Sequence, residues 1–304
     1  MNPNSLSESP SATPPDEAAR DAAKDAADPA AVKELAQKQF AGSAERFVES
    51  KLHREGDDLL QLVALAELRG DERVLDVATG GGHTALAFSR RAREVVASDL
   101  TPRMLEVAAA FLREQGAHNV RTARADAEAL PFADGSFDVV TARIAPHHFP
   151  RPERFVREVA RVLVPGGRFL LDDNMAPEDD ELDAFLHRFE KWRDPSHVRA
   201  WRPSEWRAMC EAAGLVVTHQ EPLAKKTYDF AEWTQRMRLP EAEREALAAW
   251  LLAAPRRCRE FFELQTVPAP GAQPDDQADA QGASAARVRS LCATFGILLA
   301  RKPA

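Results

Sequence analysis

Short apolar runs alternate with helical patterns along the middle of this chain. Buried strands are predicted at 74–77, 95–98, 120–123 and 137–143. The clearest helix between them begins at Thr101-Pro102, a cap residue followed by Pro at the first helical position, and ends at Gly116. Strands that alternate with helices in this way are typical of a parallel sheet covered by helices.

The alternation continues to residue 218 and then changes. Further helices are predicted at 152–163 and 206–213, and further strands at 168–171, 215–218 and 293–300. About 70 residues therefore separate the last two strands. Within this segment residues 230–263 have apolar side chains at helical spacing, and the low-complexity stretch 268–285 predicts a flexible loop.

These patterns divide the chain into five parts. Residues 1–30 are rich in Ala, Pro, Ser and Asp with hardly any large apolar side chains, which predicts a disordered tail. The other parts are an N-terminal helical lid at 31–68, a core at 69–220, a helical insertion with a flexible loop at 221–288, and the last core strand at 289–304. We expect the insertion to cover the substrate pocket, because variable segments on a rigid scaffold carry specificity. A surface appendage away from the pocket is the alternative.

A three-glycine turn at 80–82 follows the first strand and opens a short helix near His83. This unit binds an adenosine-bearing cofactor, because glycines allow close approach and the helix presents free N–H groups. Asp76 stands four residues before the first glycine, where it would repel a pyrophosphate and attract an ammonium group. S-adenosylmethionine carries such an ammonium group. Asp99, after the second strand, is placed to accept hydrogen bonds from the two ribose hydroxyls.

The stretch from about Gln39 to Val217 resembles a class I S-adenosylmethionine-dependent methyltransferase, in particular the ubiquinone/menaquinone C-methyltransferase-like group and its stand-alone bacterial relatives. The resemblance implies a Rossmann-like α/β fold: a seven-stranded sheet, six strands parallel and the last antiparallel, with N-terminal helices and a helical insertion between strands six and seven. It also implies that Asp126 reads the adenine amino group beside the Ala127 backbone, and that Arg143 lies near the cofactor. Ala78 replaces the first glycine of the family motif, as it does in the quinone-methylating group.

The expected cofactor contacts are Asp76, Ala78, Gly80, Gly81, Gly82, Asp99, Leu100, Asp126, Ala127, Arg143 and His53. The last of these belongs to the N-terminal helical part and is expected to close over the methionine end.

Composition limits the kinds of partner and the cellular compartment that we expect for this chain. The net charge of −8 over 304 residues argues against nucleic acid as the main partner, because phosphate contacts need clustered Lys and Arg. Three scattered cysteines without metal spacing are typical of a reducing compartment, and we expect a cytoplasmic protein. No apolar run approaches the ~18 residues of a membrane span.

The methyl acceptor is expected to bind where the segments 144–149 and 172–174 leave strands four and five, with the segment 193–199 nearby. Methyl transfer to a phenol or an activated aromatic carbon is helped by removal of a proton, and neutral histidine suits that task. His147 and His148 are the first candidates and His197 the next; the alternative is that they only shape the loop. No metal site is expected, because the histidines lack ligand spacing. The other histidines, at 83, 118, 187 and 219, are interpreted as surface residues.

We expect a small, partly apolar acceptor, with Phe149, Trp192, Trp201 and Trp233 available as walls. Methylation of the amino group of adenine or cytosine is disfavoured, because the expected Asn/Asp-Pro-Pro-aromatic turn after strand four is absent. Formation of 5-methylcytosine is disfavoured as well, because no Pro-Cys nucleophile occurs. A nicotinamide oxidoreductase is a second hypothesis, although Asp76 and the lack of a Tyr/Lys pair argue against it. A non-catalytic S-adenosylmethionine-binding protein is a third.

Deleting residues 1–30 should leave folding and cofactor binding intact, because this composition has no means to pack. Thermal melts and calorimetry of the truncated chain check this. A large loss of melting temperature would contradict it.

Overall fold

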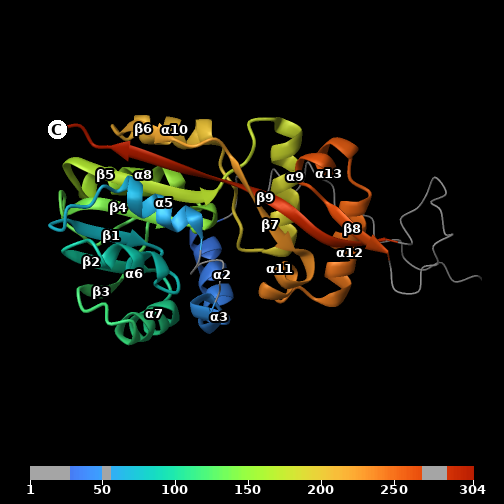
Figure 1. Ribbon diagram of the computed structural model, residues 1–304, viewed down its shortest axis with the longest axis horizontal. Coiled ribbons are helices and arrows are strands. Elements are labelled where there is room, and N and C mark those ends of the chain that lie inside the picture. The colour runs from blue at the N-terminus through green and yellow to red at the C-terminus, as the bar shows by residue number, and fades with distance from the viewer. Residues whose placement is uncertain (1–27, 50–55, 269–285) are drawn as a thin grey trace, which may run out of the picture.

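The computed structural model describes residues 28–49, 56–268 and 286–304 (Figure 1). A central sheet runs through the molecule. In the described part of the chain its main path has the order β3-β2-β1-β4-β5-β9-β6. The strands are β1 (Arg73–Val77), β2 (Glu94–Asp99), β3 (Val120–Arg124), β4 (Phe137–Arg143), β5 (Leu163–Asn174), β6 (Val216–Gln220) and β9 (Ala286–Arg301). The first five are parallel, and β9 runs antiparallel to both β5 and β6. Six parallel strands and an antiparallel last strand confirm the expected core.

The strand β9 is twice as long as the 293–300 run predicted from sequence, with 16 residues. Its second half lies in the core sheet, and its first half extends outward, where it pairs with β7 (Ala224–Asp229) and β8 (Gln265–Pro268). The insertion therefore contains the strands β7 and β8 in addition to the expected helices. Figure 1 shows β9 as one arrow that spans the core and the insertion.

Helices cover both faces of the core sheet. One face is covered by α5 (Asp57–Leu65), α6 (His83–Ser89) and α7 (Pro102–Glu114), and the other by α8 (Pro152–Val162) and α10 (Pro203–Ala212). Alternate residues of β9 serve the two faces, since Leu298 packs with the α8 and α10 side and Leu299 with the α5 and α6 side. The alternation explains why the end of β9 is apolar throughout.

The insertion has a core of its own. It is built from α9 (Asp180–Arg193), which precedes it in the chain, together with α11 (Phe230–Arg236), α12 (Glu241–Leu252) and α13 (Arg256–Phe261). Trp233, Phe189 and Phe262 are buried there against Leu291 of β9. The first half of β9 therefore forms one side of the hydrophobic core of the insertion.

The N-terminal helices α2 (Pro29–Ala41) and α3 (Ala44–Glu49) lie between the core and the insertion (Figure 1). Asp28 caps α2 by accepting from the Ala30 amide at 3.0 Å, so the helix begins earlier than the expected boundary at residue 31. On the insertion side, Gln39 Nε2 donates to the Met237 carbonyl oxygen at 3.5 Å. Residues 1–27 of the tail expected at 1–30, and residues 269–285 of the loop expected at 268–285, lie outside the described residues.

Across the described ranges, no helix is both long and apolar enough to span a membrane.

Replacing Leu298 with Ala should cost about 2–5 kcal/mol of unfolding free energy, because the side chain is fully buried in the core. Leu60→Ala is the matched control: that leucine is 71% exposed, and its loss should change stability by no more than about 0.5 kcal/mol. Urea unfolding with an unchanged m-value measures both. Equal effects for the two variants would contradict the packing described here.

Candidate cofactor and acceptor site

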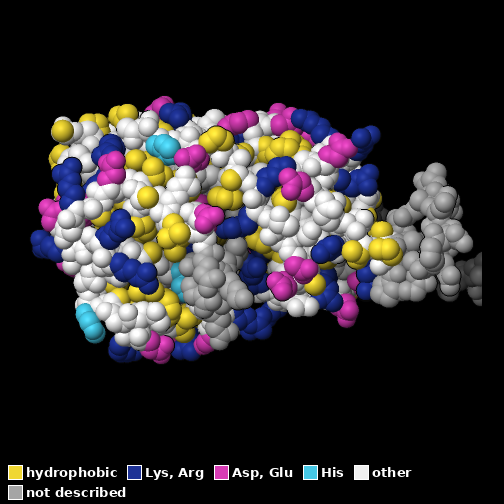
Figure 2. All heavy atoms as spheres, in the orientation of Figure 1, with side chains coloured by type: hydrophobic (Ala, Val, Ile, Leu, Met, Phe, Trp, Pro, Cys, Tyr) yellow, Lys and Arg dark blue, Asp and Glu magenta, His cyan; other side chains and the backbone are white. Residues whose placement is uncertain are grey.

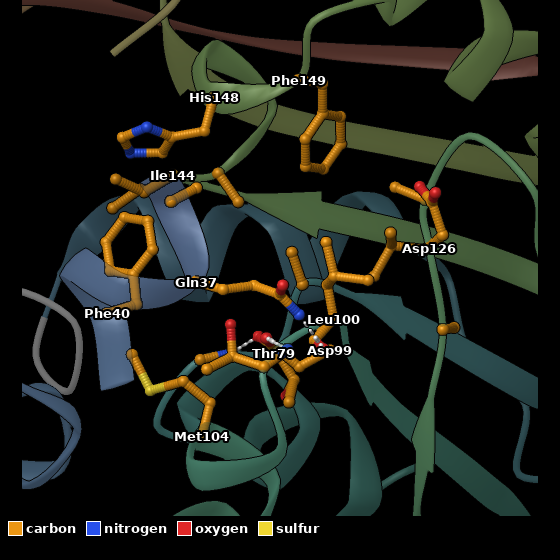
Figure 3. Close-up of a pocket in the computed structure, with 18 of the residues that line it drawn as sticks. Gln37, Phe40, Thr79, Asp99, Leu100, Met104, Asp126, Ile144, His148 and Phe149 are labelled. Carbon is orange, nitrogen blue, oxygen red and sulfur yellow. Dashed lines mark hydrogen bonds between the residues drawn. The ribbon is translucent and has the colours of Figure 1, made fainter. Parts of the chain in front are cut away.

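A cavity of about 1010 Å³, including its open mouth, lies beyond the carboxyl ends of β1, β2 and β4 (Figure 3). Its walls come from the glycine turn, the segments after β2, β3 and β4, and the helix α2. The expected cofactor residues on these walls are Ala78, Gly80, Gly81, Asp99, Leu100, Asp126, Ala127 and Arg143. The sequence therefore located the cavity correctly.

The turn after β1 depends on left-handed backbone. Ala78, Gly80 and Gly82 have φ of 55°, 54° and 88°. A Cβ at Gly80 would project into open space, whereas one at Gly81 would lie 3.0 Å from the Phe47 backbone. Gly81 is thus required by the close approach of α3, and Gly80 leaves its backbone accessible from the cavity. Gly82 lies beneath the turn and is not on the cavity wall.

Asp99 closes β2 with its carboxylate at the cavity. Oδ2 accepts from the Gly80 amide at 3.1 Å and Oδ1 from the Thr101 amide at 2.8 Å. Burial raises the pKa of Asp99. These two hydrogen bonds fix the carboxylate beside the glycine turn, where it would accept a hydrogen bond from a ribose hydroxyl.

Asp76 does not reach the cavity wall. It is buried beneath the turn, where its Oδ2 accepts from Thr79 Oγ1 at 2.6 Å. Burial raises the pKa of Asp76 to about 7. In this structure the side chain holds the turn. The expectation that Asp76 attracts the ammonium group, directly or through water, stays a prediction.

Asp126 and Leu100 are held by α2, through contacts that the sequence analysis missed. Lys33 Nζ lies 2.7 Å from Asp126 Oδ2 and 2.7 Å from Glu128 Oε2. Gln37 Nε2 donates to the Leu100 carbonyl oxygen at 2.9 Å. Lys33, Gln37 and Phe40 follow each other at spacings of four and three residues on one helix face, a signal that was present in the sequence.

Arg143, the last residue of β4, lies in a buried charge network. Its Nε lies 3.0 Å from Asp58 Oδ2 of α5 and 3.1 Å from Asp172 Oδ2 of β5. Lys226 of β7 is 3.6 Å from the same Asp58 oxygen. Burial and the neighbouring Asp58 raise the pKa of Asp172 to about 8. The network closes one end of the cavity.

Three histidines lie together, His147 and His148 in the loop after β4 and His197 in the segment after α9. The ring centroids of His147 and His148 are 4.1 Å apart, and those of His147 and His197 are 5.2 Å apart. Of the three, only His148 lines the cavity. His147 is buried behind it, with Nδ1 2.6 Å from Asp173 Oδ1, and His197 is fully buried.

His148 has a defined environment. Its Nδ1 lies 3.0 Å from the Ser196 carbonyl oxygen, which can only accept, so Nδ1 carries the hydrogen and Nε2 the lone pair. Nε2 lies 3.9 Å from Asp194 Oδ2. Burial and the neighbouring His147 lower the pKa of His148 to about 4, which keeps the ring neutral at pH 7.

The interpretation of His83 as a surface residue was wrong. His83, interpreted as a surface residue, is buried and lines the cavity, and its Nε2 lies 3.1 Å from the Phe47 carbonyl oxygen. A helix start directly after three glycines is a buried position, and this was the signal available in the sequence. His53 lies outside the described residues. Within the described ranges, no group of three or more metal-ligating side chains forms a metal site.

The expected aromatic walls are mostly elsewhere. Phe149 lines the cavity, but Trp192 and Trp233 belong to the insertion core, and Trp201 packs against the core of the sheet. The apolar wall is formed instead by Phe40, Phe47, Met104 and Ile144. Figure 3 shows Phe40, Ile144 and His148 at one end of the cavity and Asp126 and Phe149 at the other.

These residues fit S-adenosylmethionine. The accessible backbone at Gly80, the carboxylate of Asp99 and the apolar Leu100 and Phe149 suit a ribose and an adenine ring. The end near Arg143 is left for the sulfonium and the acceptor.

Comparisons with known proteins identify the family of this chain. Residues 75–171 match the family model described as a methyltransferase domain. The chain is 49% identical over 176 residues to an uncharacterized methyltransferase, YcgJ of Bacillus subtilis, covering 58% of this chain and 70% of that protein. It is 36% identical over 188 residues to the uncharacterized protein YafE of Escherichia coli, covering 60% and 88% of the two chains.

A crystal structure of a putative methyltransferase from Bacillus halodurans superposes with a TM-score of 0.73 at 40% identity, covering 82% of this chain and 100% of the other. The expected kinship with the quinone-methylating group is also found, with 39% identity over 135 residues to a ubiquinone/menaquinone biosynthesis C-methyltransferase of Azotobacter vinelandii, covering 42% and 53% of the chains. These matches do not support a nicotinamide oxidoreductase. With its glycine turn, its strand order and relatives that it covers over most of their length, this chain belongs to the class I S-adenosylmethionine-dependent methyltransferases.

Proposed function

We propose that the chain methylates a small, partly apolar acceptor, aromatic or quinone-like, at the end of the cavity formed by Phe40, Ile144 and His148. The observation that carries this proposal is that a buried, neutral histidine and an apolar wall meet at that end (Figure 3). The names of several relatives, ubiquinone/menaquinone C-methyltransferases, support an acceptor of this kind.

S-adenosylmethionine supplies an electrophilic methyl group on a positively charged sulfur. On this proposal Asp99 accepts from the ribose hydroxyls and Asp126, with the Ala127 backbone, reads the adenine. Lys33 and Gln37 of α2 hold this end of the site closed, because they bind Asp126 and the Leu100 carbonyl. We therefore assign α2 and α3 the role of a lid, which is what the sequence analysis expected of the N-terminal helices.

His148 is the proposed base. Its Nε2 lone pair would take the proton of the acceptor, and the nearby Asp194 carboxylate would stabilise the imidazolium that forms. His147, bound to Asp173, supports the loop and acts through His148. The protein's remaining contribution is to hold the acceptor atom in line with the methyl group and to exclude water.

Asp99→Ala should weaken S-adenosylmethionine binding by about 1.5–3 kcal/mol, the scale of a hydrogen bond to a charged group. Asp126→Ala should weaken it less, because burial of the adenine contributes independently and Lys33 already engages that carboxylate. Asp134→Ala, at an 82% exposed side chain, is the control and should have no effect. Titration calorimetry measures all three, and unchanged affinity in Asp99→Ala would remove the ribose assignment.

His148→Ala should lower turnover by about 10²–10⁴-fold while cofactor affinity stays nearly unchanged, because the side chain acts on the acceptor. Adding His147→Ala should lower it little further. Because burial lowers the pKa of His148 to about 4, turnover should not decline through protonation of this residue between pH 8 and pH 6. Transfer of labelled methyl groups to a panel of phenols and quinols measures this. A double variant that turns over at the wild-type rate would show that the histidines only shape the loop.

A further inference from the structure

One lysine of the helix α2 joins two neighbouring acids on the wall of the cavity. Lys33 Nζ donates to Asp126 Oδ1 at 3.0 Å and to Asp126 Oδ2 at 2.7 Å, and it also donates to Glu128 Oε2 at 2.7 Å. All three residues line the cavity. A lysine ammonium group has three donors, and these contacts can occupy all of them. The charge of Lys33 is therefore directed at this pair of acids.

Glu128 anchors the lysine from the side of the core. Its side chain is only 2% exposed, and besides Lys33 it binds Arg151. The Arg151 Nε donates to Glu128 Oε2 at 3.0 Å, and the Arg151 amide donates to Oε1 at 2.8 Å. A buried carboxylate costs free energy unless it is paired and hydrogen-bonded, and here it is both. Glu128 therefore offers Lys33 Nζ a position that does not depend on Asp126.

Asp126 differs from Glu128, because its carboxylate keeps an acceptor position. Among the residues that the structure describes, Oδ1 accepts from Lys33 and from the Glu128 amide at 3.0 Å, whereas Oδ2 accepts from Lys33 only. A carboxylate has about four acceptor positions, two on each oxygen. The position that remains belongs to Oδ2, and the Asp126 side chain is 32% exposed at the cavity wall. Oδ2 can therefore accept one donor from a ligand.

The contact between Lys33 and Asp126 depends on the docking of α2 against the core. One turn further along this helix, Gln37 Nε2 donates to the Leu100 carbonyl oxygen at 2.9 Å. Figure 3 shows Gln37 directed toward Leu100 within the cavity. Both contacts join the helix to segments that follow strands of the sheet, β2 for Leu100 and β3 for Asp126. Lys33 therefore reaches Asp126 while α2 lies over the cavity, and it loses that contact when the helix moves away.

Asp126 and Glu128 carry like charges two residues apart, and their carboxylates would repel each other without a cation between them. Lys33 offsets this repulsion and holds the Asp126 carboxylate in one orientation. We propose that Lys33 is a positioning residue for adenine recognition, because it fixes Asp126 so that the remaining acceptor position of Oδ2 meets the adenine amino group. The adenine is then recognised only when α2 is closed. This inference rests on the proposed function, which assigns the adenine to Asp126.

The test compares S-adenosylhomocysteine with its 6-deamino analogue, in which a hydrogen atom replaces the adenine amino group. Titration calorimetry on the full chain measures the affinity for each ligand. The wild-type chain should bind S-adenosylhomocysteine at least about tenfold more tightly, because the analogue leaves the Asp126 oxygen without its donor. Lys33→Met should reduce this preference to less than about threefold, because the carboxylate is then free to turn away. Lys33→Arg keeps the positive charge and should retain part of the preference.

Lys38→Met is the matched control on the same helix. The Lys38 side chain is 72% exposed, and its Nζ lies 2.7 Å from Glu34 Oε1, one turn earlier. Figure 2 shows acidic and basic side chains mixed over the surface that it presents, and the pair of Lys38 and Glu34 is of this exposed kind. An exposed ion pair contributes little. Lys38→Met should therefore keep the wild-type preference.

The outcomes separate this inference from the proposed function, with Asp126→Ala measured beside the lysine variants. If Lys33→Met weakens the binding of both ligands by the same factor, the preference is kept, Lys33 only closes the lid, and the inference is wrong. A larger preference in Lys33→Met would show that the lysine competes with the adenine for the carboxylate, which also overturns the inference. In both cases the assignment of Asp126 stands if Asp126→Ala loses the preference. If Asp126→Ala keeps the wild-type preference, that assignment fails, and the role of Lys33 fails with it.

Discussion

The buried guanidinium of Arg143 is the constraint on which the arrangement of the site depends. It belongs to the core, but its carboxylate partners are Asp58 of an N-terminal helix and Asp172 of β5, and Asp58 is also near Lys226 of the insertion. Breaking one side of such a buried pair leaves an uncompensated charge, which is strongly destabilising. The three parts of the chain must therefore meet at the carboxyl end of β4, and this is where the acceptor end of the cavity lies.

The strand β9 imposes the second constraint. A methyltransferase sheet needs its last strand between β5 and β6, and here the same strand continues past the sheet to pair with β7 and β8. Strand pairing fixes the register of the insertion relative to the core. Backbone hydrogen bonds therefore hold the insertion relative to the core more firmly than a loop connection would.

The strands β1, β2 and β4 and the second half of β9 could be predicted because they are buried on both faces and appear as nearly continuous apolar runs. The same criterion could not find β7 and β8: β7 has the sequence Ala-Lys-Lys-Thr-Tyr-Asp, and all four residues of β8 are exposed. In the site, Asp99 and Asp126 could be located from motif spacing, since both lie at strand ends. The positions of Asp76 beneath the turn and of the tryptophans in the insertion depend on tertiary packing, which spacing does not encode. Lys33 shares a helix face with Gln37 and Phe40, but its partner Asp126 lies 93 residues away, and spacing along the chain does not show that pairing.

The two ends of the cavity differ in charge, and the difference suits methyl transfer. The cofactor end holds the Asp99 carboxylate and the Lys33 ion pair, whereas at the acceptor end burial keeps His148 neutral and the charge of Arg143 is paired with that of Asp58. Methyl transfer disperses the charge of the sulfonium, so a site of low polarity around the reacting atoms favours it over the charged ground state.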